Sequence, residues 1–432
     1  MATTFLRRTS GTPTNSKKTT LSVWLKRSGL GTGTFFGGGS DSNNMTFINF
    51  NPNGKIFLQS SVSGSNTLVF ITTQVFKDTS AWYHIVVAID TTQGTASNRV
   101  KLYVNGVQVT AFDTATYPSQ NLDLEWNKSN KTLEIGKYLF QGTYSIYDGL
   151  MSHYNFVDGT AYAPTLFGET DSTTGQWKIK TSPSVTYGNN GFFILKDGNT
   201  ITDSSSNSNN FSLSGGTLTK TEDCPDNVFC VLNFLDTTRG LSNGNTTFAG
   251  ASSGTVVKGS LGMLTGKYYA ECKILSAAQN MIGVLSMAQA PSTAYVGATA
   301  VGWGLFGDGT LYNNASSTSN FSGSFSNNDI MGIALDMDNN KLYFSKNGVF
   351  QNSGNPTSGA TGTGAVSITS GLTMTFCGGR DSSADTANFN FGNGYFGTTA
   401  VSSAGTNASG NGIFEYNVPA GFTALSTKGL NL

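Results

Sequence analysis

Charge is scarce in this 432-residue chain. Only 12% of its residues are Asp, Glu, Lys or Arg, and 25 acidic residues balance 25 basic ones, so the formal net charge is zero. A neutral chain lacks the positive field that attracts nucleic acid or an anionic membrane surface. We therefore expect no nucleic acid among its partners.

Long apolar runs are also missing. No stretch approaches the roughly 20 apolar residues that a membrane-spanning helix needs, so we expect no membrane insertion. The N-terminal stretch 1–20 has basic residues but no apolar segment behind them, and we do not interpret it as a secretory signal.

Cysteine and histidine are few, which restricts the chemistry. Four cysteines fit no paired C-x2-C metal pattern, so we expect buried free thiols. The two histidines, His84 and His153, fall in apolar strand-like stretches, where a packed or cross-strand-paired side chain is expected.

Turn-forming residues are abundant instead. The chain has 53 Gly, and Ser, Thr and Asn fill the gaps between short runs rich in Phe, Tyr, Val and Ile. This composition is typical of short strands joined by turns. Two phrases nearly repeat, VKLYVNGVQV at 100–109 and NKLYFSKNGVF at 340–350. Asn-Gly accommodates the positive backbone angles of tight hairpin turns, so two units built on one kind of hairpin are predicted.

The pattern of runs predicts an all-β fold with two antiparallel β-sandwiches, over 1–168 and 223–432. Between them, 169–222 is rich in Gly, Ser and Asn and holds a single apolar strand at 191–195. We interpret it as a connector packed on a neighbouring domain. One long β-solenoid is the alternative, but no fixed short period is found.

Two family resemblances refine this prediction. Residues 78–112 resemble the centre of laminin-G-like, concanavalin A-like jelly-roll domains through Trp82, His84 and the run 102–106. The run 149–169 looks like the closing strand and short helical turn of that family. GKYYAECKI at 266–274 and the run 330–349 resemble the early strand and the hairpin of SPRY-like sandwiches.

The two ends of the chain look like segments of tailed-phage virion proteins, especially marine ones. The matching runs are 8–29 and 414–432. This resemblance implies a structural protein made in the host cytoplasm and exposed on the virion as a tail fibre, adhesin or head decoration. The implied partners are other virion proteins (capsid, tail or fibre) and a host surface polysaccharide. A homo-oligomer is expected, with a trimer as the usual form of such appendages.

Glycan or partner binding is the activity that the resemblance implies. Aromatic rings that stack on sugar C–H groups, beside amides and carboxylates, are the chemistry of such sites. The candidates in the first half are Trp126, Asn127, Gln141, Tyr144, Tyr147 and Asp148, and those in the second half are Tyr295, Trp303 and Tyr312. The alternative for each aromatic residue is a place in the core or in a subunit interface.

Calcium is the one cofactor that the laminin-G resemblance allows, because such domains often bind it on a loop rim. The candidate ligands are Asp41, Asp78, Asp90 and Asp148. Each has the alternative role of a turn residue.

Hydrolysis of glucans would need two carboxylates on either side of the sugar bond. The sequence offers only incomplete pairs: Glu169 with Asp171, Asp123 with Glu125, and Asp336 with Asp338. We therefore expect no enzyme. A purely architectural decoration is the main alternative to an adhesin, and a polysaccharide-degrading enzyme is the less favoured one.

Overall fold

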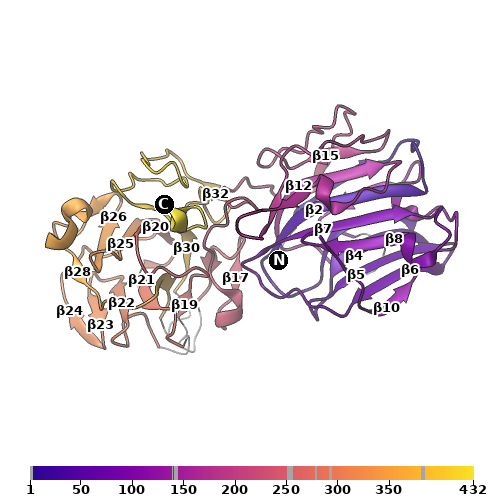
Figure 1. The fold of residues 1–432 in the computed structure, drawn as a ribbon. Coiled ribbons are helices and arrows are strands. Elements are labelled where there is room, and N and C mark those ends of the chain that lie inside the picture. The colour runs from indigo at the N-terminus through magenta and orange to yellow at the C-terminus, as the bar shows by residue number, and fades with distance from the viewer. Residues whose placement is uncertain are drawn as a thin grey trace. The chain divides into compact units, whose positions relative to one another are not determined.

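The computed structural model describes residues 3–138, 140, 145–250, 256–277, 280–290, 294–380 and 385–432. The chain divides into two compact units, Met1–Lys220 and Thr221–Leu432, each built from antiparallel sheets (Figure 1). The predicted all-β class is confirmed. No helix in these ranges is long and apolar enough to cross a membrane.

The first unit has two large sheets. The order in the larger is β10-β6-β5-β4-β3-β11-β1-β16. Its strands are β1 (Phe5–Thr9), β3 (Gly33–Asp41), β4 (Asn44–Phe50), β5 (Ile56–Val62), β6 (Ser65–Thr72), β10 (Phe112–Thr116), β11 (Thr132–Ile135) and β16 (Ser212–Gly215). The order in the smaller is β15-β12-β2-β7-β8-β9. Its strands are β2 (Lys18–Arg27), β7 (Trp82–Asp90), β8 (Val100–Val104), β9 (Val107–Gln108), β12 (Gly149–Asp158) and β15 (Phe192–Ile194).

Short elements complete this unit. They are the hairpin strands β13 (Gly168–Thr170) and β14 (Trp177–Ile179), and the 3-10 turns η1 (Ala96–Asn98), η2 (Glu125–Asn127) and η3 (Pro164–Leu166). The core follows the period of two that strands impose. Leu21, Val23 and Leu25 of β2 enter the core between the sheets, whereas Trp24 lies on the opposite face, as their alternation predicts.

The stretch interpreted as a connector lies within the first unit up to Lys220. β15 pairs with β12, β16 pairs with β1, and the β13–β14 hairpin packs on the smaller sheet through Trp177. It has four strands instead of one. Only 191–195 is apolar enough to be recognised as a strand, because the other three are short: β13 and β14 pair only with each other, and the polar β16 pairs with the distant β1.

The second unit also has two large sheets, whose inner faces enclose its main core. The strands of the larger sheet are β17 (Leu241–Ser242), β18 (Thr247–Phe248), β20 (Lys267–Ile274), β25 (Ile330–Asp336), β26 (Lys341–Lys346), β27 (Val349–Phe350), β28 (Val366–Ser367), β30 (Ala387–Asn390) and β33 (Thr423–Ala424). The strands of the smaller sheet are β19 (Val257–Lys258), β21 (Met281–Ser286), β22 (Gly302–Phe306), β23 (Leu311–Asn313), β24 (Ser316–Thr318) and β29 (Met374–Gly378). The remaining elements are β31 (Tyr395–Phe396), β32 (Thr399–Ala400), η4 (Phe234–Asp236), η6 (Pro356–Thr361) and η7 (Gly429–Asn431).

The repeated phrase forms the same hairpin in both units. The backbone N–H of Asn105 donates to the carbonyl of His84 at 2.9 Å, and the side-chain oxygen of Asn105 accepts from the N–H of His84 at 2.8 Å. Asn347 makes the same two bonds with Ile330, at 2.8 and 2.9 Å. Each Asn therefore closes its turn and clamps the preceding strand.

An aromatic ring covers the glycine of each turn. A Cβ atom on Gly106 would lie 2.5 Å from the Trp177 ring, and one on Gly348 would lie 2.6 Å from the Tyr416 ring. Both glycines also have positive φ, +80° and +81°. Only glycine fits the backbone angle and the contact together.

Residues 405–418, the C-terminal strap, cross the outer face of the larger sheet in the second unit. Phe414 of the strap packs edge to face on Tyr269 of β20, with ring centroids 5.1 Å apart. Two strap backbone N–H groups donate to the buried carboxylate of Glu271 on the same strand. The strap thus supplies a second, smaller cluster of buried side chains on this face.

The four cysteines are free, as predicted. Cys230, Cys272 and Cys377 are buried, and Cys224 is half-buried. Burial raises the pKa of the Cys272 and Cys377 thiols well above the usual value. These thiols therefore stay protonated and act as small apolar core groups.

Candidate functional site

Trp126 lies in the core of the first unit. The residue is 1% exposed, and its ring stacks on Phe36 with centroids 4.9 Å apart. It sits on the short turn η2, which directs it inward between the sheets. The prediction that Trp126 offers a sugar-stacking face is therefore wrong, and the core alternative holds.

Asn127 is a structural hub. Its side-chain N–H donates to the Asp158 carboxylate at 2.6 Å, and its oxygen accepts from the Asn190 side chain at 3.0 Å. Asp158 also accepts from the backbone N–H groups of Thr14 and Asn15. These hydrogen bonds join three segments of the chain. Because Asn127 is only 1% exposed, its amide does not face a ligand.

The other first-half candidates do not assemble a site. Tyr147 is 6% exposed and belongs to the core, where burial raises the pKa of its phenol well above the usual range. Asp148, the next residue in the sequence, is exposed at the surface. Gln141 and Tyr144 lie outside the described residues. The first unit therefore offers none of its predicted aromatic faces to a ligand among the residues described.

The second unit does bring two predicted residues together. Tyr295 and Tyr312 are half-buried, and their rings meet edge to face with centroids 5.7 Å apart. Phe306 at the end of β22 adds a third ring, 6.4 Å from Tyr312. The guanidinium carbon of Arg380, just after β29, lies 4.5 Å from the Phe306 centroid. We call these four residues the aromatic–arginine cluster.

A segment lying flat on the smaller sheet positions this cluster. Tyr295 pairs with Arg380 in an isolated β-bridge, and the adjacent Val296 is fully buried. A Cβ atom on Gly304 of β22 would lie 2.2 Å from the Val296 carbonyl oxygen. Glycine at 304 is what allows the segment to approach the sheet so closely.

Sequence reasoning missed Phe306 and Arg380 and misplaced Trp303. Trp303 is 4% exposed and, with Leu305, faces the core. The alternation along β22 then turns Phe306 outward, a signal that was present in the sequence. Nothing local marks Arg380, because it reaches the cluster through the pairing of strands far apart in the chain.

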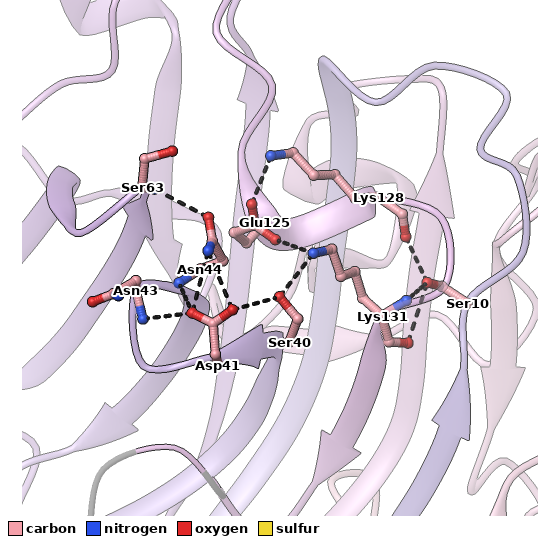
Figure 2. A network of polar contacts seen from close by, with 9 residues as sticks. All are labelled: Ser10, Ser40, Asp41, Asn43, Asn44, Ser63, Glu125, Lys128 and Lys131. Atoms are coloured by element: carbon pink, nitrogen blue, oxygen red, sulfur yellow. Dashed lines mark hydrogen bonds and ion pairs between the residues drawn. The ribbon is translucent and has the colours of Figure 1, made fainter.

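The calcium candidate Asp41 is surrounded by hydrogen-bond donors (Figure 2). Its carboxylate accepts from the backbone N–H groups of Asn43 and Asn44 at 2.8 and 2.9 Å, and from the hydroxyl of Ser40 at 3.2 Å. These bonds, that of the Asn43 N–H first, lower the pKa of Asp41. The Lys131 ammonium, 3.0 Å from the Ser40 oxygen, adds a positive charge to the same network.

The same network holds a buried carboxylate. Glu125, on η2 beside Trp126, is 1% exposed and lies 2.6 Å from the Lys128 ammonium and 3.3 Å from that of Lys131 (Figure 2). The arrangement therefore ties η2 to the β3–β4 turn through Lys131. It is a structural ion network, in which the ammonium groups of Lys128 and Lys131 balance the negative charges of Glu125 and Asp41.

The other calcium candidates serve turns too. Asp78 accepts from the N–H and hydroxyl of Ser80, and Asp90 from those of Thr92. Asp148 is exposed and lies just before β12, far along the chain from the other three candidates. Within the described ranges, no group of three or more His, Cys, Asp or Glu side chains is placed to hold a metal ion.

We expect calcium to leave the melting temperature of the first unit unchanged. A bound ion at 100 times its Kd would stabilise the unit by about 2.7 kcal/mol, an easily measured rise. The check is a thermal melt in millimolar calcium against one in excess chelator, with magnesium as the control for ionic strength. A calcium-specific rise that Asp41→Asn abolishes would contradict this.

His84 is sandwiched between two tryptophans. Its ring lies 4.7 Å from that of Trp24 and 5.9 Å from that of Trp177, both stacked. Because the indole N–H of Trp177 donates to Nδ1 at 3.0 Å, the proton of the neutral imidazole sits on Nε2, which donates to the Ser22 hydroxyl at 2.8 Å. This polarity is the reverse of a serine–histidine nucleophile pair, in which Nε2 accepts the serine proton.

Acidification should weaken the first unit. Burial lowers the pKa of His84 to about 3 and that of His153 to about 4, from about 6.5 in the unfolded chain. The stability they contribute is therefore complete above pH 6.5 and is lost as the pH falls toward the folded values. From pH 7 to pH 5 we expect a loss of about 2 kcal/mol per histidine, measured by urea unfolding. His84→Gln should remove about half of this slope, and an unchanged slope would refute the assignment.

The predicted carboxylate pairs are engaged locally. Glu169 and Asp171 pair with Lys178 on the β13–β14 hairpin. Asp336 is fully buried and lies 3.1 Å from the Lys267 ammonium. These contacts give Glu169, Asp171 and Asp336 each a lysine partner in the described part of the chain.

Comparisons with known proteins agree with both resemblances. Residues 6–161 match the family model described as the concanavalin A-like lectin/glucanases superfamily, of laminin-G type. Residues 267–393 match the model of the SPRY domain. The chain carries a concanavalin A-like domain followed by a SPRY domain. It is thus built of two domain types that serve as carbohydrate- or protein-binding modules.

Solved structures similar to this chain include SPRY domains. The SPRY domain of human HERC1 is 18% identical, with a TM-score of 0.30, and the match covers 37% of this chain and 96% of that one. The TRIM65 PSpry domain is 15% identical, with a TM-score of 0.30 over 37% and 89%. A heptameric SAP-like pentraxin from Limulus polyphemus is 18% identical, with a TM-score of 0.28 over 37% and 71%. No curated protein matches the chain.

Proposed function

We propose that this protein is a non-enzymatic surface component of a tailed-phage particle that binds a host polysaccharide through its SPRY domain. The two binding-module domains support the binding role. The resemblance of residues 8–29 and 414–432 to phage virion segments supports the location. The local ion pairs of Glu169, Asp171 and Asp336 support a role without hydrolysis.

The aromatic–arginine cluster is the observation that carries the binding role. Its rings are half-buried, whereas Trp126 and Tyr147 in the first unit and Trp303 in the second are at most 6% exposed. A sugar ring can stack its C–H face only on an aromatic ring that water also reaches. Among the predicted aromatic residues that the structure describes, this criterion selects Tyr295 and Tyr312.

The test is a pull-down of the purified chain with host cells and with phage particles that lack it. The proposal predicts binding to cells that free host polysaccharide competes for and that Tyr295→Ala/Tyr312→Ala loses. Ser403→Ala, at an exposed site outside the aromatic–arginine cluster, is the control that keeps binding. Binding to particles alone would make the protein an architectural decoration. Light scattering of the same sample would test the expected homo-oligomer.

A further inference from the structure

Arg380 differs from every other arginine of the chain. The sequence has six arginines. Five of them donate from the guanidinium to oxygen atoms of the protein: Arg7, Arg8, Arg27, Arg99 and Arg239. In the described part of the chain, the Arg380 guanidinium has no hydrogen-bond acceptor and no carboxylate within ion-pair distance. Its partner is the face of Phe306, 4.5 Å away.

The two tyrosines share this lack of a partner. Within the described ranges, the hydroxyls of Tyr295 and Tyr312 make no hydrogen bond, although both rings are packed. The rings of Phe306 and Tyr312 lie 6.4 Å apart, so one continuous row runs from the guanidinium over three rings. The row offers a fixed cation, aromatic surface and two hydroxyls to whatever binds there.

The chemistry of the row specifies a ligand class. A guanidinium can bind a carboxylate with two parallel N–H···O bonds, geometry that an ammonium cannot supply. Aromatic rings next to it suit the C–H face of a sugar, and phenol hydroxyls suit sugar hydroxyls. The chain has no net charge to attract a polyanion from a distance, and Arg380 is the positive charge within the row that can select an anion.

We propose that the SPRY domain recognises an acidic polysaccharide whose sugars carry carboxylates, with Arg380 binding the carboxylate and Tyr295 and Tyr312 contacting the sugar ring. This inference rests on the proposed polysaccharide-binding function. It adds that the ligand is a uronic-acid type of polymer and not a neutral one.

Binding of the full-length chain to sodium polygalacturonate, to dextran and to poly-L-glutamate separates the possibilities. Polygalacturonate should bind, and dextran should bind at least about tenfold more weakly. Arg380→Gln should lose about tenfold in affinity for polygalacturonate, whereas Arg380→Lys should lose less because it keeps the charge. Lys428→Gln removes an exposed positive charge elsewhere in the same unit and should bind like the parent.

Each contrary result has a distinct meaning. Equal binding of dextran and polygalacturonate, lost in Tyr295→Ala/Tyr312→Ala but kept in Arg380→Gln, would overturn the acidic ligand and leave the proposed function standing. Poly-L-glutamate binding as tightly as polygalacturonate would overturn the sugar specificity. Absence of binding to any polymer and to host cells would remove the proposed function as well. Unchanged melting temperatures show that the variants are folded.

Discussion

Replacing Glu271 with alanine is expected to lower the free energy of unfolding of the SPRY-containing unit by about 3–5 kcal/mol at pH 5. The Glu271 carboxylate is fully buried and accepts from the backbone N–H groups of Glu415 and Tyr416, both at 2.8 Å. The Tyr269 hydroxyl and the Asn390 side chain donate to it more weakly, at 3.3 and 3.4 Å. Alanine would leave these donors unpaired, at about 1–3 kcal/mol for each buried group, and would open a cavity.

The same carboxylate predicts a pH dependence of opposite sign to that of the first unit. Burial raises the pKa of Glu271 to about 7, against about 4.5 in the unfolded chain. Its stabilisation is therefore complete below pH 4.5 and is lost as the pH rises through 7, a change on the order of 3 kcal/mol. Burial also raises the pKa of Asp385 to about 6, so a loss of stability of the same sign, on the order of 3 kcal/mol, is complete near that pH.

Glu271→Gln is the matched control. At pH 5 the Glu271 side chain is protonated, and glutamine has the shape of that neutral form but cannot ionise, so we expect a smaller loss than for alanine and no slope between pH 6 and 8. Hydrogen exchange should show the C-terminal strap, 405–418, opening first in both variants. Wild-type stability that is flat from pH 4.5 to 7.5, or a strap that exchanges no faster in Glu271→Ala, would contradict this account.

The sequence predicted the strands well because residues that face the core alternate along a strand with residues that face away from it. Leu21, Val23 and Leu25 pointed to the core and Trp24 away from it, as found. The Asn-Gly phrases predicted both hairpins, since the turn chemistry is local. The rings that cover those turns, Trp177 and Tyr416, were not predictable, because each comes from a segment about 70 residues farther along the chain.

Loop residues were where sequence reasoning failed. The local sequence around an aromatic residue next to Asn and Asp does not show whether its loop directs the ring into the core or toward solvent. Trp126 and Tyr147 turn inward and belong to the core of the first unit. Arg380 was missed for a different reason. Nothing in its local sequence marks it, and it reaches the aromatic–arginine cluster only because β21 pairs with both β22 and β29.

Replacing Trp126 with alanine should cost the concanavalin A-like unit about 3–5 kcal/mol, the usual loss when a large buried ring is deleted from a packed core. The indole N–H of Trp126 has no acceptor in the described part of the chain, so the cost is one of packing against Phe36 and its neighbours. Trp126→Phe keeps most of that contact and removes the unpaired N–H, so it should cost less than half as much.

Urea unfolding and polysaccharide binding, measured on the same variants, distinguish a core residue from a ligand platform. Trp126→Ala should unfold at lower urea while its SPRY-borne binding stays within twofold of the parent, since the residue lies in the other unit. Tyr295→Ala should do the reverse, because a half-buried surface ring contributes little to stability. A Trp126→Ala chain of undiminished stability that no longer binds polysaccharide would restore the sugar-stacking role that its burial argues against.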